Sequence, residues 1–158
     1  MISPNSSKPS KPFKYFQIRW KEAMGDPNDP YLIRWMFIAF NRSIRIHKWI
    51  RSDDTRFFHD HSSDFTSIVL KGNYFNVTPK GRFNVKAFSI WKAKATDRHY
   101  LEIPKEGAWT LLFCGKPYYK WGFWTKENQK MRPLRYFHTF GGSAVNKTKE
   151  NVSKHHKE

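Results

Sequence analysis

Two histidines separated by a single residue, His59 and His61, are the side chains whose type and spacing point most clearly to chemistry. Successive side chains of a β-strand point to opposite faces, so this pair would share one face and Asp60 would point to the other. Their Cα atoms would lie about 7 Å apart, close enough for both imidazoles to bind one ion. The spacing therefore predicts part of a metal site that needs another ligand from elsewhere in the chain.

His99 is the predicted third ligand. It opens the run HYLEIP, in which His99, Leu101 and Ile103 would share one face of a strand. A bare HxH is usually a chance pair on a solvated strand, and the later histidine on a separate strand favours the metal site over that alternative. Asp64 follows the pair by three residues and could add a carboxylate ligand or cap a turn, and the sequence favours neither role.

A site built from three imidazoles keeps coordination positions open for water, dioxygen or substrate. Imidazoles suit several metals, and a carboxylate from Asp64 would also suit manganese, so the predicted cofactor is one divalent transition metal: Fe, Mn, Ni or Zn. Asp97 and Arg98 directly precede His99 and could orient it from behind. An ordinary turn explains Asp97 slightly better.

The other histidines and the single cysteine are expected to be structural; they are His47, His138, Cys114 and the pair His155 and His156. His47 would share a face with Arg45 and Trp49, where a surface or cross-strand role is expected. Cys114 lies in the apolar run WTLLFC and should be a buried thiol, not a nucleophile. The histidine pair near the C-terminus belongs to a polar segment.

Strand-forming runs dominate the middle of the chain and must position these groups. Gly81, in TPKGR, is typical of a hairpin turn. One helix is expected at 16–24, in FQIRWKEAM, ended by Gly25 and Pro27. Six to eight short strands predict an all-β barrel or sandwich. The predicted strands lie at 31–40, 43–50, 66–79, 82–93, 99–104 and 108–115, with shorter candidates at 121–124 and 135–140.

The chain has 158 residues, which suits a single hydrophobic core. Residues 1–14 and 141–158 are polar and lysine-rich, so we expect flexible arms around one barrel domain at 15–140. The formal net charge is +16, of which the terminal segments carry +3 and +2 and the body +11. Such a basic body serves solubility or the binding of anions.

The first residues lack an apolar segment of the secretory type, and no run reaches the length of a membrane span. A cytoplasmic protein without membrane contact is therefore expected, and a single cysteine excludes an internal disulfide. The sequence leaves a homodimer open.

The spacing of these groups resembles the cupin superfamily, whose first motif places HxH, an acidic residue and a glycine, and whose second supplies a later histidine. The resemblance implies a double-stranded β-helix, or jelly-roll barrel, with His59, His61, Asp64 and His99 at the metal. More narrowly, HDHSSDFTSIVLKGNY, RHYLEI and AWTLLFCGKPYYKWGFWT resemble a small family of mostly uncharacterised bacterial and phage proteins, over about residues 31–125. The acidic residue comes earlier than usual, and the PxG of the second motif is missing.

Because three-histidine cupins include dioxygenases, isomerases and plain binding proteins, the resemblance implies a class of site and no single reaction. We expect a metal-dependent enzyme, oxygenase-like or isomerase-like, acting on a small anionic substrate. A metal-binding or ligand-binding cupin without turnover is one alternative. A nucleic-acid-associated protein is another, because one segment alternates basic and aromatic side chains that could bind phosphates and stack on bases. A strand that packs its aromatic side chains on the core explains the same segment equally well. Its residues are Lys116, Tyr118, Lys120 and Trp121.

Overall fold

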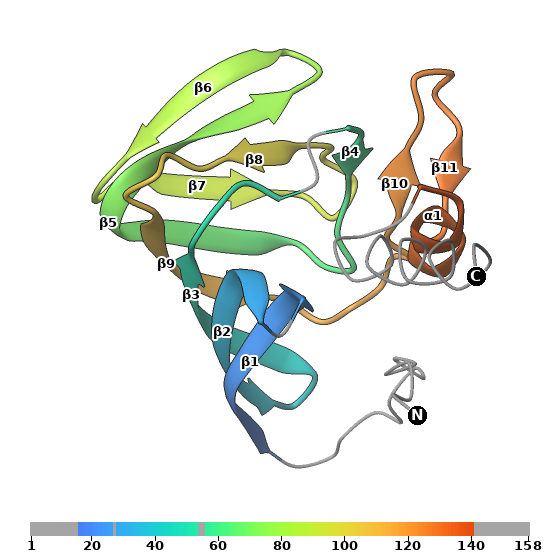
Figure 1. The fold of residues 1–158 in the computed structure, drawn as a ribbon. Helices are drawn as coiled ribbons and strands as arrows, with labels where there is room; N and C mark the ends of the chain where they lie inside the picture. Colours follow the sequence, from blue (N-terminus) through green and yellow to red (C-terminus); the bar gives the residue numbers. More distant parts are fainter. Residues whose placement is uncertain (1–15, 27, 54–55, 141–158) are drawn as a thin grey trace, which may run out of the picture.

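The chain is built almost entirely from antiparallel β-strands, as Figure 1 shows. The computed structural model describes residues 16–26, 28–53 and 56–140. The strands in these residues are β1 Gln17–Asp26, β2 Asp29–Ala39, β3 Arg42–Trp49, β4 Phe58–His59, β5 Phe65–Thr78, β6 Gly81–Lys86, β7 Ile90–Ala93, β8 Tyr100–Glu102, β9 Ala108–Cys114, β10 Phe123–Trp124 and β11 Lys130–Met131, followed by helix α1 Pro133–Phe140.

The long strand β5 organises the sheets. Its first half pairs with β7 and β9, and its second half pairs with β6 and β8. The main sheet continues from β9 through β3 and β2 to β1 at its edge. A small sheet in the order β11, β10, β4 lies at one side, next to α1 (Figure 1). Two layers of strands therefore enclose an interior, with β5 belonging to both.

β5 changes partners at a bulge and a glycine. The register of its pairing with β9 shifts between Val69 and Lys71, and Gly72 has a φ of 78°. A Cβ atom at Gly72 would lie 2.5 Å from the carbonyl oxygen of Gly107, a clash that only glycine avoids. The bulge and glycine allow the strand to bend and pack closely against the start of β9.

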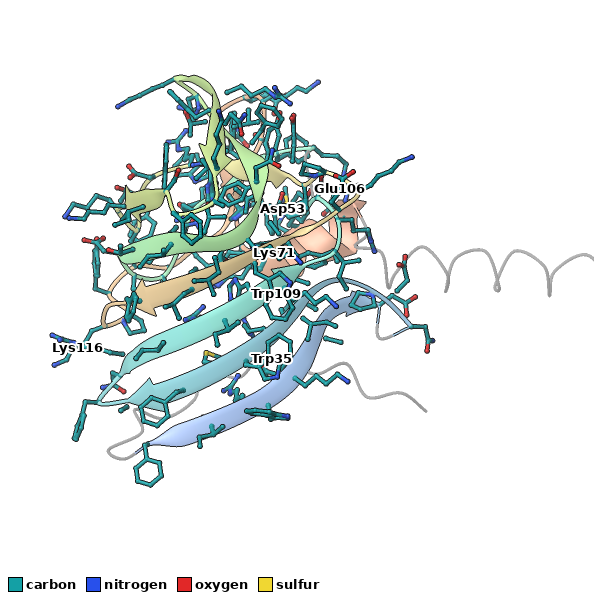
Figure 2. All side chains as sticks on the ribbon, turned by 90° about the vertical axis from the view of Figure 1, so that its left-hand side faces the viewer. Trp35, Asp53, Lys71, Glu106, Trp109 and Lys116 are labelled. Atoms are coloured by element: carbon teal, nitrogen blue, oxygen red, sulfur yellow. The ribbon has the colours of Figure 1, made fainter. Side chains whose placement is uncertain are left out.

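Apolar side chains fill only one part of the interior. A buried cluster is formed by Val69, Tyr74, Val85, Leu101 and Ala108. The outer face of the main sheet carries large rings too: Figure 2 shows Trp35 and Trp109, whose centroids lie 5.7 Å apart with rings nearly parallel, from β2 and β9. Buried polar side chains occupy the rest of the interior, which is where the candidate site lies.

The helix predicted at 16–24 is wrong, because this segment forms the edge strand β1. It pairs with β2, and its register shifts between Arg19 and Glu22, where Lys21 adopts a positive φ of 54°. Glu22 accepts a hydrogen bond from Arg34 Nη2 of β2 at 2.8 Å. Cross-strand pairing therefore prevails over the helix propensity of the Lys-Glu-Ala-Met run.

The strand predicted at 135–140 is also wrong, since this segment belongs to α1. Pro133 suits the first helical position, because its ring fixes φ and its missing N–H would have no partner there. Tyr136 is fully buried, and its ring stacks on Phe123 of β10 with centroids 3.8 Å apart. The helix thus closes over the small sheet.

The run predicted as one strand at 82–93 is divided into β6 and β7 by a turn at Phe88, whose φ is 67°. The other strand predictions are confirmed in the described residues, and the hairpin at 78–82 joins β5 to β6 with Gly81 at a φ of 140°. The boundaries of the barrel at 15 and 140 remain predictions, and the proposed arms at 1–14 and 141–158 lie outside the described residues. Within those residues, no helix has the length and apolar character needed to cross a membrane.

Candidate metal centre

Backbone hydrogen bonds bring the two histidine-bearing segments together. His59 and His99 exchange both of their N–H···O hydrogen bonds, each 2.9 Å long, as an isolated antiparallel bridge. The amide of His61 donates to the carbonyl of Ala95, also at 2.9 Å. The chain from His59 to His61 therefore lies against the segment that leads into β8.

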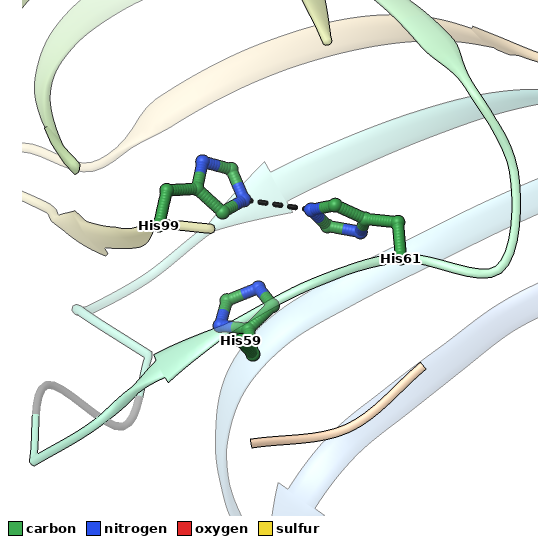
Figure 3. A group of neighbouring side chains, drawn as sticks. All are labelled: His59, His61 and His99. Atoms are coloured by element: carbon green, nitrogen blue, oxygen red, sulfur yellow. Dashed lines mark hydrogen bonds between the residues drawn. The ribbon is translucent and has the colours of Figure 1, made fainter. Parts of the chain in front are cut away.

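The three imidazoles converge on one point. Each of His59, His61 and His99 offers a ring nitrogen, and these atoms lie within 4.8 Å of one another. Figure 3 shows the ring of His61 directed at that of His99, with 2.8 Å between their Nε2 atoms. Two nitrogens that each bind one ion at about 2.1 Å are roughly 3 Å apart when adjacent, so this separation suits a shared ligand set.

Side chains behind the ligands fix their orientation. Asn76 Oδ1 lies 2.7 Å from His99 Nδ1, and since an amide oxygen only accepts, Nδ1 must carry the proton and Nε2 the lone pair. His59 Nδ1 lies 3.8 Å from Asp53 Oδ2. The contact between His99 and Asn76 is the usual arrangement of metal-binding histidines, whose second nitrogen bonds to an oxygen, whereas Asp53 is an acidic neighbour of His59 beyond hydrogen-bond distance. Asn76 and Asp53 were missed in the sequence; the only signal was that Asn76 shares the inward face of its strand with Tyr74.

The site favours uncharged imidazoles. Burial, followed by the charges of neighbouring histidines, lowers the pKa of His61 well below its usual value. Burial and the charge of His59 act in the same direction on the pKa of His99. A metal binds the neutral form of imidazole, so the cavity holds these two side chains in the state that coordination requires.

Asp60 points away from the histidines, as the strand alternation predicts, and holds the histidine segment to the small sheet. Its carboxylate is fully buried and accepts hydrogen bonds from the Gly122 amide at 2.7 Å and from Trp124 Nε1 at 2.8 Å. Lys130 Nζ lies 2.7 Å from its second oxygen. A buried carboxylate with these donors anchors His59 and His61 from behind.

The structure does not bring Asp64 to the imidazoles: among the described residues, the group of converging ligand atoms contains only the three histidines. Its oxygens accept hydrogen bonds from the Tyr118 hydroxyl at 2.6 Å, the Ala95 amide at 2.8 Å and Lys94 Nζ at 3.1 Å. These donors lower the pKa of Asp64 to about 2, with the Tyr118 hydroxyl contributing most. Asp64 therefore ties two loops together.

Asp97 and Arg98 do not orient His99. Asp97 Oδ2 accepts a hydrogen bond from the Lys94 amide at 2.8 Å, which closes the turn before β8. The guanidinium of Arg98 lies over the ring of Trp124 and contacts Asn128 Oδ1. The side chain that bonds to the second nitrogen of His99 is Asn76 instead.

Of the two roles expected for His47, surface or cross-strand, the surface role is wrong, because the side chain is buried on a strand between β2 and β9. It is 6% exposed and lines a cavity of about 120 Å³ into which the three candidate ligands also face. Cys114 is buried, as predicted, and lines the same cavity. The side chain of His138 and the pair His155 and His156 lie outside the described parts of the chain.

The basic and aromatic segment lies on the surface beside the site. Lys116, Tyr118, Lys120 and Trp121 are exposed, and the amide of Tyr118 donates to the carbonyl of Ser62 at 2.9 Å. Trp121 packs against Phe123 with 5.7 Å between ring centroids. The segment therefore rests on the loop after the histidine pair, and its role toward anions stays a prediction.

No protein-family model matches the sequence, and no curated protein is significantly similar to it. Solved structures do match. A cupin-2 domain protein from Rhodospirillum rubrum is 14% identical, with a TM-score of 0.54 over 77% of this chain and 87% of that one. An RmlC-like cupin from Ralstonia eutropha is 14% identical, with a TM-score of 0.50 over 77% of this chain and 84% of that one. The Fe(II) form of HppE matches with a TM-score of 0.49 and 8% identity over 60% of this chain, which spans 56% of that longer protein.

The fold of this chain matches the first two of these proteins over about three quarters of its length. At this level of identity the agreement concerns architecture alone. This mostly β chain, with three histidines converging in its interior, has the cupin fold.

Proposed function

We propose that this protein is a metal-dependent enzyme, oxygenase-like or isomerase-like, that acts on a small anionic substrate. The observation that carries the proposal is the convergence of three imidazoles within 4.8 Å in an interior cavity. Three protein ligands leave positions where a substrate or water can bind, which is the arrangement of catalytic metal sites, whereas structural sites are closed.

The donor set fits a divalent transition metal such as Fe, Mn, Ni or Zn. The imidazoles of His61 and His99 are held neutral by burial, and Asn76 orients His99 so that Nε2 faces the site. A bound metal would act as a Lewis acid or redox centre. The cavity walls would exclude bulk water, and His59, His61 and His99 would hold the ion where the substrate enters.

Two observations support an anionic substrate. The chain carries a net charge of +16, which attracts anions over about a Debye length. Arg45 also lines the cavity, so a positive charge lies near the candidate ligands. The cavity volume of about 120 Å³ favours a small molecule over a polymer.

Metal analysis tests the ligand set. The full chain would be loaded separately with Fe(II), Mn(II), Ni(II) and Zn(II), the first without oxygen, and its metal content measured after desalting. About one ion per chain is expected, with loss in His61→Ala and His99→Ala. The double substitution His155→Ala/His156→Ala should keep the ion, because these histidines belong to the C-terminal segment. Retention of metal by His99→Ala together with its loss from the C-terminal variant would reject the site.

Turnover separates an enzyme from a binding protein. The loaded protein would be incubated with a panel of small carboxylic acids, with oxygen uptake followed by electrode and isomerisation by NMR. An enzyme should lose conversion in His59→Ala while remaining folded. Stoichiometric metal without conversion of any acid in the panel would favour the non-catalytic alternative.

A further inference from the structure

The wall of the cavity formed by β3 has polar side chains that the metal site does not use. Arg45 and His47 alternate along this strand with Ile44, Ile46 and Lys48, which are exposed on the outer face of the sheet. The alternation directs Arg45 and His47 into the interior, where both line the cavity shared with the candidate ligands.

His47 is buried without a hydrogen-bond partner. It is 6% exposed, and neither ring nitrogen forms a hydrogen bond within the described residues. Its neighbour Trp49 contacts it only edge to face, with centroids 5.6 Å apart. Buried polar groups are normally paired, so both ring nitrogens of His47 are available to a molecule that enters the cavity.

Arg45 is in a comparable position. Its Nε donates to Ser43 Oγ at 2.9 Å, which uses one of its five N–H donors. No acidic side chain of the described residues forms an ion pair with it. Glu22, on the edge strand β1, is paired with Arg19 and Arg34. A half-buried guanidinium that forms no ion pair can bind an anion.

We propose that Arg45 and His47 bind the carboxylate of a short hydroxy- or oxo-carboxylic acid. The hydroxyl or oxo oxygen of this acid would then point toward His59, His61 and His99. The planar guanidinium matches a carboxylate in a two-point hydrogen bond. His47 in its neutral form adds one N–H donor and one acceptor. The orientation toward the histidines deepens the proposed function and rests on it, whereas the carboxylate subsite itself does not.

Acetate binding to the metal-free full-length protein tests the subsite alone. The titration would be followed by NMR through backbone amides and the ring nitrogens of His47. Arg45→Gln should weaken acetate binding by about 10-fold to 100-fold, the range for a hydrogen bond to a charged group. His47→Leu should weaken it by about 10-fold. Lys48→Gln removes a charge from the outer face of the same strand and should leave the dissociation constant unchanged.

The amide spectrum of each variant reports whether it folds. If Arg45→Gln does not fold, Arg45→Lys replaces it, because it keeps the charge and loses the planar fork; acetate should then bind several-fold more weakly than to the wild type. Equal affinities of the wild type and the folded Arg45 and His47 variants would overturn the proposal. Tighter binding of inorganic phosphate than of acetate would overturn the carboxylate class.

The two proposals fail separately. Glycolate added to the Co(II)-loaded protein should change the visible spectrum of the metal, and this change should need higher glycolate concentrations in Arg45→Gln at the same metal content. Metal content unchanged by the histidine substitutions, combined with acetate binding that depends on Arg45, would reject the metal enzyme and support the subsite. Full metal content together with acetate binding that does not depend on Arg45 would support the metal site and reject the carboxylate subsite.

Discussion

The two walls of the cavity carry buried histidines that differ in hydrogen bonding. On the wall formed by β4 and β8, His99 is held by a backbone bridge to His59 and by Asn76 at its Nδ1. On the β3 wall, His47 is equally buried and has no partner for either ring nitrogen in the described residues. A metal ligand must be aimed before the ion arrives, whereas a group that binds substrate keeps its donors available.

The largest effect is expected from removing the hydrogen bonds and the ion pair that hold the wall formed by β4 and β8. Asp60→Ala removes a fully buried carboxylate that accepts hydrogen bonds from Gly122 and Trp124 and pairs with Lys130. The donors and the ammonium would lose their partner, so the free energy of unfolding should fall by about 3–5 kcal/mol. Urea denaturation followed by tryptophan fluorescence measures it. A loss below about 1 kcal/mol would mean that Asp60 does not anchor the histidine segment.

A second effect concerns the aim of His99. Asn76→Leu removes the oxygen that fixes the Nδ1 proton, so metal affinity should fall by about 10-fold to 100-fold. Competition with a chelator of known affinity measures the change. Asn76→Asp is the control, because a carboxylate also accepts from Nδ1 and should keep affinity within a few-fold of the wild type. Equal affinity of the leucine variant would show that His99 needs no orienting partner.

On the wall formed by β3, a substitution should raise the free energy of unfolding instead of lowering it. His47→Leu replaces an unpaired buried imidazole by an apolar side chain, so the free energy of unfolding should rise by about 1 kcal/mol at neutral pH. Burial, together with Arg45 and Arg34, lowers the pKa of His47 to about 3. The unfolded chain takes up a proton near its ordinary value of 6.5 while the folded chain does not.

The advantage of the leucine variant should therefore grow as the pH falls from 6.5 toward about 3, since only the wild type loses stability through this histidine. Denaturation of both metal-free proteins across this range gives the difference. A difference that shrinks as the pH falls would indicate that His47 is protonated in the folded state.

The smallest effect is expected at Asp64, which lies at the surface beside the wall formed by β4 and β8. Its folded pKa of about 2 is below the unfolded value of 3.8, so its contribution to stability is present above the unfolded value and is lost as the pH falls toward 2. Asp64→Asn should be slightly less stable than the wild type at pH 7 and equal to it near pH 2. Its metal content should match the wild type, and a loss of metal would return Asp64 to the ligand set.

Strand periodicity predicted most of the architecture, because alternating side chains and turn residues are local signals. It placed His59 and His61 on one face, Asp60 on the other, and the hairpin at Gly81. It failed at Phe88, where a turn divides one predicted strand into β6 and β7, and at the two ends of the described chain. The segment that forms β1 has helix-forming residues and becomes a strand by pairing with β2, and α1 depends on the packing of Tyr136 against Phe123.

By itself the sequence determined which residue types were available and how they alternate: three histidines on two strand-forming runs, and a chain able to form one β-barrel. Only the tertiary structure decided which side chains meet. It put Asn76 and Asp53 behind the histidines, directed Asp64 to Tyr118, and left Arg45 and His47 facing the candidate ligands. The reason is physical: strand alternation is set within a few residues, whereas contacts between side chains far apart in the chain depend on sheet register and on the bend at Gly72.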